Sequence, residues 1–325
     1  MKAEESKARI AALVLGVAAY CLLPSGYFLF AASGLYQVRE VKPHVFVWVP
    51  DDVIDQEADP QFSRAGTAGF IVTGEGVVVI DSTNSPFHGR ELLYEIRQRT
   101  EAPVRYVVNT DASGEHMLGN EVFVDQRAIL ISTPEAKEEM LQYRQGLAAR
   151  LEAEDGWKLQ PRVRGFHVTP ATQTFQKEMV LRLGGEDIKL LPLLPYGDSA
   201  VYLPAAKVLF LGELFENGYY PRIESRDVRR WIETLRQLES WDVEVYVPGH
   251  GEPGDKKALG EFRQFLEKLV NDVESRLQQG KTLAQVKQEL LADEDHRHAP
   301  ELAARAVEAV YRQLSESRQE LRATH

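Results

Sequence analysis

The sequence predicts an α+β fold arranged as a four-layer αββα sandwich, in which two β-sheets lie face to face and helices cover their outer sides. Three observations predict it: hairpin-forming strand pairs, strand–helix alternation, and the return of that order in a second, similar half of the chain. A sheet must bury its apolar face against another layer, so this order favours two packed sheets with helices outside. An N-terminal transmembrane helix and a C-terminal helical extension are expected to flank the sandwich.

The first half of the sandwich begins with apolar alternation at residues 44–49, which is typical of a strand. Two apolar runs at 69–73 and 77–81 are joined by Gly74-Glu75-Gly76, a hairpin pattern. The expected elements that follow are a helix at 87–100, strands at 104–108, 121–124 and 128–132, and a charged helix at 134–154.

The second half predicts strands at 187–193, 200–204 and 207–212, then a helix at 226–239 and a buried strand at 243–247. Residues 256–325 have helical spacing throughout. Gly280 is expected to end one helix and Thr282 to cap the next. We interpret this C-terminal extension as packing or interaction helices that follow a main domain at 45–255.

Composition excludes several function classes. The chain of 325 residues has a formal net charge of −11, which argues against a nucleic-acid partner because phosphate binding needs a basic surface. Cys21 is the only cysteine, so an intrachain disulfide is impossible. A cofactor-dependent redox function is disfavoured, since no glycine-rich dinucleotide fingerprint follows a strand and no cysteine cluster exists.

The N-terminus predicts membrane attachment. Residues 10–32 are 23 consecutive positions without a charge, and about 20 apolar residues span a bilayer as a helix. Lys2, Lys7 and Arg9 precede this segment, which favours residues 1–9 in the cytoplasm and the domain on the extracytoplasmic, periplasmic side of a single-pass membrane protein. The alternatives are a cleaved signal peptide and a buried core helix. Residues 33–44 are expected to be a linker.

A polar loop at 108–120 carries the main functional signal. It reads Val-Asn-Thr-Asp-Ala-Ser-Gly-Glu-His-Met-Leu-Gly-Asn and directly follows a predicted strand. This loop resembles the signature of the metallo-β-lactamase-fold superfamily, in which a strand runs into His-x-His-x-Asp-His and then Gly-Asn. The resemblance extends over residues 45–255 and is supported, in order, by 69–72 with Asp81, by 196–198, by 211–215 and by 248–251.

The resemblance implies a metallohydrolase fold, but it also implies that the first of the family's two metal sites is lost. The positions of its three histidines read Asp111, Ser113 and Leu194. Leucine cannot bind a metal, and serine is a poor zinc ligand. A binuclear zinc centre is therefore not expected.

The positions of the second site keep coordinating groups: Glu115, His116, Glu213 and His250. Two imidazoles and two carboxylates suit one divalent ion, zinc first and iron or manganese as alternatives. Asp111 can add a third carboxylate. Each glutamate replaces the family's aspartate and moves its carboxylate by about 1 Å, whereas metal–ligand distances tolerate only about 0.2 Å. The alternative is that the acids are polar remnants in a cleft, His116 a core histidine and His250 a turn residue.

Several further residues have two interpretations. The resemblance implies that Asp81 supports His116 without touching the metal, and the alternative is that it caps the following turn. Asp198 has the same two interpretations. The remaining candidates either line a substrate rim or pack at the surface: Glu216, Asn217, Tyr219 and Tyr220. His296 and His298 resemble a metal-binding tract, but we interpret them as part of a solvated loop.

Two functions remain open from the sequence. In the first, the protein is a hydrolase with one metal, which polarises the substrate and lowers the pKa of water, while Glu115 acts as ligand, general base, or both. The substrate is an unknown small molecule. In the second, the protein is a pseudoenzyme, a non-catalytic binding or scaffold module that docks a protein partner or small ligand at the membrane surface.

Overall fold

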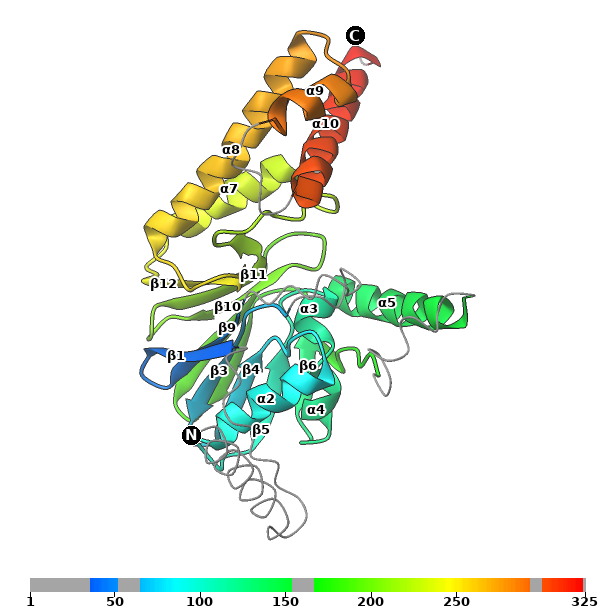
Figure 1. Cartoon of the computed structure of the whole chain (residues 1–325). Coiled ribbons are helices and arrows are strands. Elements are labelled where there is room, and N and C mark those ends of the chain that lie inside the picture. Colours follow the sequence, from blue (N-terminus) through cyan, green and yellow to red (C-terminus); the bar gives the residue numbers. More distant parts are fainter. Residues whose placement is uncertain (1–35, 52–64, 154–166, 293–299, 324–325) are drawn as a thin grey trace, which may run out of the picture. The chain divides into compact units, whose positions relative to one another are not determined.

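The computed structural model describes residues 36–51, 65–153, 167–292 and 300–323, with the side chains of 319–323 left undescribed. Over these residues the chain forms two mixed β-sheets with helices on their outer sides (Figure 1). Residues 36–325 form one compact unit. The α+β fold class expected from the sequence is confirmed for this unit.

The first sheet has seven strands in sequential order. Strands β1 to β4 are antiparallel to their neighbours and β4 to β7 are parallel. The strands are β1 (Tyr36–Lys42), β2 (Val45–Pro50), β3 (Ala68–Thr73), β4 (Gly76–Ile80), β5 (Val104–Val108), β6 (Ile129–Ser132) and β7 (Gln173–Thr174).

The second sheet has five strands in the order β12-β11-β10-β9-β8. It is antiparallel except for the pair β11 and β12. The strands are β8 (Met179–Leu183), β9 (Glu186–Pro192), β10 (Ser199–Leu203), β11 (Val208–Glu216) and β12 (Val245–His250). Because β11 and β12 are parallel neighbours, their carboxyl ends lie side by side at one edge of this sheet.

Side-chain alternation along the strands divides the core into layers. In β4, Val78 and Ile80 pack between the sheets, whereas Val77 and Val79 pack against helices on the outer side. Both faces are apolar because both are buried, which explains the continuous apolar run in the sequence. Full burial of each such side chain stabilises the fold by about 1.5–3 kcal/mol.

Helices α2 (Pro86–Arg97) and α4 (Asn120–Val124) cover the outer face of the first sheet. The outer face of the second sheet packs against α7 (Val228–Glu239), α8 (Lys256–Gln278), α9 (Leu283–Leu290) and α10 (Pro300–Ala323). Two more helices lie within the described residues, α3 (Gly114–Met117) and α5 (Pro134–Glu152). The C-terminal helices thus belong to the outer layer of the sandwich, and the cap predicted at Thr282 is present as a capping box.

Three elements differ from the sequence-based expectation. Residues 121–124, expected as a strand, lie in α4, where Val122 and Phe123 are buried; a short apolar run cannot distinguish strand from helix. The segment expected as a linker contains β1, whose half-exposed, charged pattern is typical of an edge strand. Strands β7 and β8 were not predicted, because β7 has only two residues and β8 is another sheet edge.

The expected membrane anchor at residues 10–32 lies outside the described residues. Within the described ranges, no helix is both long and apolar enough to cross a membrane.

Candidate metal centre

Four side chains meet at the carboxyl ends of strands from both sheets. Glu115 and His116 lie in the short helix α3, which follows the loop after β5. Glu213 lies within β11, and His250 is the last residue of β12. All four are buried, and one ligand atom from each lies within 4.8 Å of the others. Four of the five residues that the sequence predicted as metal ligands therefore lie together, and the fifth, Asp111, is outside this group.

The closest contacts run between imidazole nitrogens and carboxylate oxygens. His250 Nε2 lies 2.6 Å from Glu115 Oε2 and 3.2 Å from Glu213 Oε1. His116 Nε2 lies 3.2 Å from the same Glu213 oxygen. Tetrahedral ligands at about 2.0–2.1 Å from an ion are about 3.3 Å apart. Glu213 Oε1 thus has two neighbours at separations close to those of a tetrahedral site.

The rear of the His116 ring is fixed by two contacts. Its Nδ1 lies 3.2 Å from Asp81 Oδ2, which is ion-pair distance without the alignment of a hydrogen bond. The two Asp81 oxygens also accept from Thr110, one from the backbone N–H and one from the hydroxyl, both at 2.8 Å. Gly66 lies against the ring, where a Cβ would be 2.3 Å from His116 Cε1. Asp81 is therefore placed to orient His116.

A buried polar network holds the backbone of α3. The His116 carbonyl accepts from the Ser82 N–H at 2.7 Å and from Asn109 Nδ2 at 3.2 Å. Asn120 in turn exchanges side-chain hydrogen bonds with Asn109 and accepts one from Ser82. Because buried polar groups are costly unless paired, this closed network fixes the loop as one arrangement.

An arginine contacts the cluster from its open side. Arg222 Nη2 donates to Glu115 Oε1, while Glu115 Oε2 faces His250. Burial alone would raise the pKa of Glu115, but the charges of His250 and Arg222 hold that pKa below its ordinary value. Both Glu115 oxygens are thus engaged, and the group is a carboxylate rather than a carboxylic acid.

A second arginine lies deeper. Arg226 contacts both oxygens of Asp198, with Nη2 at 2.6 Å from Oδ1 and Nε at 3.1 Å from Oδ2, and both side chains are buried. Arg226 Nη1 donates to the Arg222 carbonyl at 3.0 Å. The role left open for Asp198 is therefore, in this structure, that of a counter-ion to Arg226.

The resemblance matched Asp111, Ser113 and Leu194 to the family's first metal site, and none of the three belongs to the converging group found among the described residues. Asp111 is buried beside the cluster but outside the four converging atoms, and its Oδ1 accepts from the Ser113 N–H at 2.6 Å. Burial, opposed by the charge of His116, raises the pKa of Asp111 to about 6. Leu194 packs into the core between the second sheet and its helices.

The four residues that the sequence suggested for a substrate rim have different surroundings. The Tyr219 ring lies 6.0 Å from the His250 ring, and the Asn217 N–H donates to the His250 carbonyl at 3.0 Å. Tyr220 instead packs edge-on against Phe265 of α8. Glu216 is buried at the end of β11. His296 and His298 lie outside the described residues.

The charges around the cluster show that it suits a cation. The buried carboxylates are Asp81, Asp111, Glu115, Asp198, Glu213 and Glu216. Arg222 and Arg226 carry only two positive charges against these six carboxylates, and burying an excess of one charge is unfavourable unless further positive charge is supplied. Burial alone would lower the pKa of His250, but the nearby carboxylates, chiefly Glu216 and Glu115, raise it to about 9. A divalent ion can supply the same positive charge, so the donor set fits a metal.

Sequence reasoning missed the two arginines and Gly66. The sequence carries only an indirect signal. Six acids lie at or next to the separate recognised motifs and require counter-charges, and Arg222 and Arg226 are four residues apart just after the strand that carries Glu213. The local sequence does not show which arginine pairs with which acid. Gly66 lies in a stretch without periodicity, so its contact with His116 has no sequence signal.

Comparison with known proteins identifies the class. The family model of the metallo-beta-lactamase superfamily matches residues 63–250, and this chain belongs to that superfamily. The resemblance stated from the motifs is thereby confirmed.

Individual relatives are distant. A linear primary-alkylsulfatase of Pseudomonas sp. (strain ATCC 19151) is 22% identical over 212 residues, which is 55% of this chain and 40% of that protein. The structure of a stereoselective inverting sec-alkylsulfatase, Pisa1 from Pseudomonas sp., matches with a TM-score of 0.62 at 17% identity, covering 86% of this chain and 50% of that one. This chain therefore spans about half the length of the alkylsulfatases that it matches.

A smaller relative matches over its whole length. The metallo-beta-lactamase from Pontibacter korlensis has a TM-score of 0.55 and 20% identity, covering 71% of this chain and 99% of that one. At these identities the structural matches show a shared fold alone.

Proposed function

We propose that this protein is a metal-dependent hydrolase that binds one divalent ion, zinc first, through Glu115, His116, Glu213 and His250. The observation that carries the proposal is the convergence of four buried ligand atoms within 4.8 Å. Superfamily membership supports it, because the family model covers the strands and loops that carry all four residues.

Each residue has a distinct role in this proposal. Glu213 Oε1, which faces both imidazoles, is the central ligand. Asp81 and Gly66 orient His116, and Arg222 contacts one Glu115 oxygen while the other oxygen faces His250. We assign Glu115 the role of ligand rather than general base, because a carboxylate with a lowered pKa and two engaged oxygens accepts protons poorly. A bound ion would supply Lewis acidity towards the substrate.

The names of the matched proteins suggest two substrate classes for this proposal. The names of two relatives refer to primary and secondary alkyl sulfate esters. We propose alkyl sulfate esters as the first substrate class to assay, with β-lactams as the second because of the matched metallo-β-lactamase.

Metal content tests the function most directly. The full chain purified with added zinc is expected to hold about one equivalent by elemental analysis. His250→Ala should lose most of it, and His167→Ala, which changes an exposed histidine outside the cluster, should keep it. Retention of less than about a tenth of an equivalent by the unmodified chain, with zinc, iron or manganese, would contradict the proposal.

One observation favours the second candidate, a non-catalytic binding module. Arg222 already neutralises Glu115, so part of the cluster is balanced without any metal. This function predicts that zinc leaves the melting temperature unchanged, both in the unmodified chain and in Glu115→Gln and His250→Ala. A zinc-dependent rise in melting temperature for the unmodified chain alone would count against it.

We also propose that residues 10–32 anchor the chain in a membrane with the domain on the extracytoplasmic side. The support is the uncharged length of the segment and the basic residues before it. The full chain should remain in the membrane fraction after an alkaline carbonate wash. The double variant Leu15→Arg/Val17→Arg should be released, and equal retention of both would overturn the proposal.

A further inference from the structure

The two arginines of the site belong to one loop. Residues 217–227, which we call the arginine loop, connect β11 to α7. Arg222 extends from it to Glu115, and Arg226 to Asp198. Arg226 Nη1 also bonds the Arg222 carbonyl, so the two halves of the loop are tied together. The position of the loop therefore determines whether a guanidinium group lies on Glu115.

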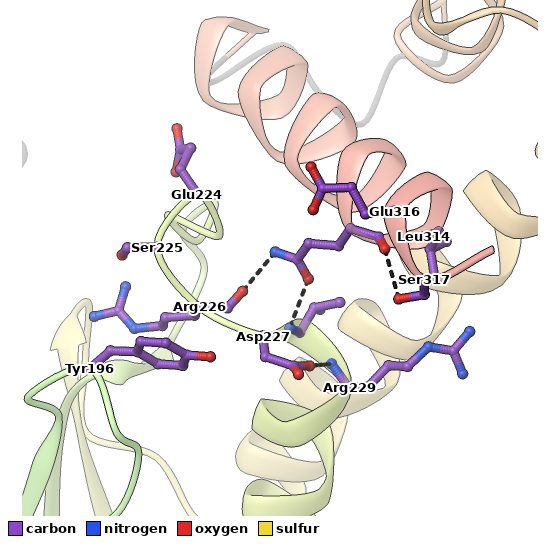
Figure 2. A pocket seen from close by; sticks show the side chains of 11 residues that line it. Tyr196, Glu224, Ser225, Arg226, Asp227, Arg229, Leu314, Glu316 and Ser317 are labelled. Carbon is purple, nitrogen blue, oxygen red and sulfur yellow. Dashed lines mark hydrogen bonds between the residues drawn. The ribbon is translucent and has the colours of Figure 1, made fainter. Parts of the chain in front are cut away.

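The C-terminal helix holds this loop from outside. Gln313 of α10 donates from Nε2 to the Arg226 carbonyl at 2.8 Å and accepts at Oε1 from the Val228 N–H at 3.1 Å. The amide nitrogen of Gln313 therefore binds the end of the loop, and its amide oxygen binds the first residue of α7. Figure 2 shows α10 facing the segment that carries Arg226 and Asp227.

Open space lies beside this bridge between the loop and α10. A pocket of about 330 Å³ separates them next to Gln313, and its walls include Tyr196, Glu224, Leu314 and Ser317 (Figure 2). Because open space adjoins the two hydrogen bonds, their loss is not replaced by close packing of neighbouring side chains. Gln313 thus supplies hydrogen bonds from α10 to the end of the loop, while Ile223 anchors the middle of the loop in the apolar core shared with α10.

We propose that Gln313 is a positioning residue for the metal centre: by holding the arginine loop, it keeps Arg222 on Glu115 and thereby weakens the hold of the cluster on a divalent cation. This inference rests on the proposed function. The physical reason is that a guanidinium group on a ligand carboxylate both competes for that carboxylate and repels an incoming cation. Release of the loop lets Arg222 leave, and the cluster then binds the ion more tightly.

The test compares Gln313→Met, which keeps the side-chain length but removes both hydrogen bonds, with Arg222→Met and the double variant. Zinc affinity is measured on the full chain by competition with a chelator. Arg222→Met should tighten binding about tenfold and Gln313→Met several-fold, while the double variant should equal Arg222→Met alone, since Gln313 acts through Arg222. Additive effects, or weaker binding in Gln313→Met, would overturn the proposal.

A second readout needs no metal. The rate at which an arginine-specific dicarbonyl reagent modifies Arg222, measured by peptide mass spectrometry on metal-free protein, should rise several-fold in Gln313→Met. Ser317→Ala, on the same helix and pocket wall, should leave that rate unchanged, and exposed Arg182 provides an internal reference. An unchanged Arg222 rate with a lowered melting temperature would mean that Gln313 is merely structural, which overturns the proposal.

The two readouts separate the failures. If the unmodified chain binds no zinc, the proposed hydrolase function fails, and the labelling result still decides whether Gln313 positions Arg222. If zinc binds but Gln313→Met changes neither affinity nor labelling, the positioning role fails and the hydrolase function stands.

Discussion

At the residue scale, the position of the His116 ring depends on Gly66, a residue without a side chain. Gly66 gives the His116 ring its place, and its N–H donates to the Glu115 carbonyl at 3.0 Å. A Cβ there would overlap the imidazole, which other buried groups prevent from moving. A glycine outside the recognised motifs therefore shapes the candidate metal centre.

Gly66→Ala is expected to destabilise the fold by about 1–3 kcal/mol through overpacking and to lower the bound zinc, since His116 must move. Chemical denaturation and elemental analysis measure the two effects. Gly74→Ala is the matched control, because a Cβ at Gly74 meets nothing within 4 Å. Equal behaviour of the two variants would show that the ring tolerates displacement.

A second residue-scale prediction concerns a buried acid far from the metal centre. Glu91 of α2 is largely buried, and one of its oxygens has no hydrogen-bond partner among the described residues. Burial and the charge of Glu95 raise the pKa of Glu91 to about 7 from 4.5. The folded state therefore holds a proton that the unfolded state releases between pH 4.5 and 7, so stability falls as pH rises through this window.

Glu91→Gln should accordingly stabilise the protein by about 1–3 kcal/mol at pH 8 and have little effect near pH 3, where the acid is neutral in both states. Denaturant unfolding at the two pH values measures this difference. Exposed Glu101→Gln serves as the control. The same gain at both pH values would rule out ionisation as the cause.

At the element scale, helix α5 has strong local start signals but buries few side chains. It begins with a good cap, the Thr133 hydroxyl accepting from the Ala136 N–H, and has Pro134 at its first position. Yet it buries only a few side chains: Ala136, Met140 and Leu147. Gly146 lies exposed in its interior, and a Cβ added there would meet nothing within 4 Å.

Gly146→Ala should therefore stabilise the protein by about 0.5–1 kcal/mol, the difference in helix propensity, without any new contact. The melting temperature or the midpoint of urea unfolding tests this. Zinc content should not change, because α5 contributes none of the four converging ligands. A loss of stability would mean that the glycine is needed for a bend or a close approach.

At the scale of the whole molecule, the C-terminal helices complete the outer layer of the second sheet. Val307 and Val310 of α10 are fully buried in the same core as Trp231 of α7 and Leu266 of α8. The Trp231 indole in turn donates to the Leu214 carbonyl at 2.9 Å, and Leu214 follows Glu213, the proposed metal ligand. The helical layer is thus continuous with the strand that carries the site.

Val310→Ala is expected to lower the free energy of unfolding by about 1–3 kcal/mol, because it removes two buried methyl groups and leaves a cavity. Glu316→Ala, exposed on the same helix, should change it by less than about 0.5 kcal/mol. A single unfolding transition in both variants would show that α10 unfolds with the sandwich. A negligible cost for Val310→Ala would instead make the helix an appendage.

The sequence determined the fold class, most strands and the identity of the four converging residues. Those features depend on local sequence. The spacing of apolar residues distinguishes strands from helices, and the order of the motifs shows which loop follows which strand. Glu115, His116, Glu213 and His250 could be identified in this way from their motif positions alone.

Only the tertiary structure decided what surrounds those four residues. Arg222 meets Glu115 across 107 positions of sequence, and Gln313 meets Arg226 across 87. Buried acids require counter-charges, but the requirement does not name the partner, because any arginine on a loop of suitable conformation satisfies it. Long-range pairing depends on how loops are held between layers, and local periodicity carries no information about that.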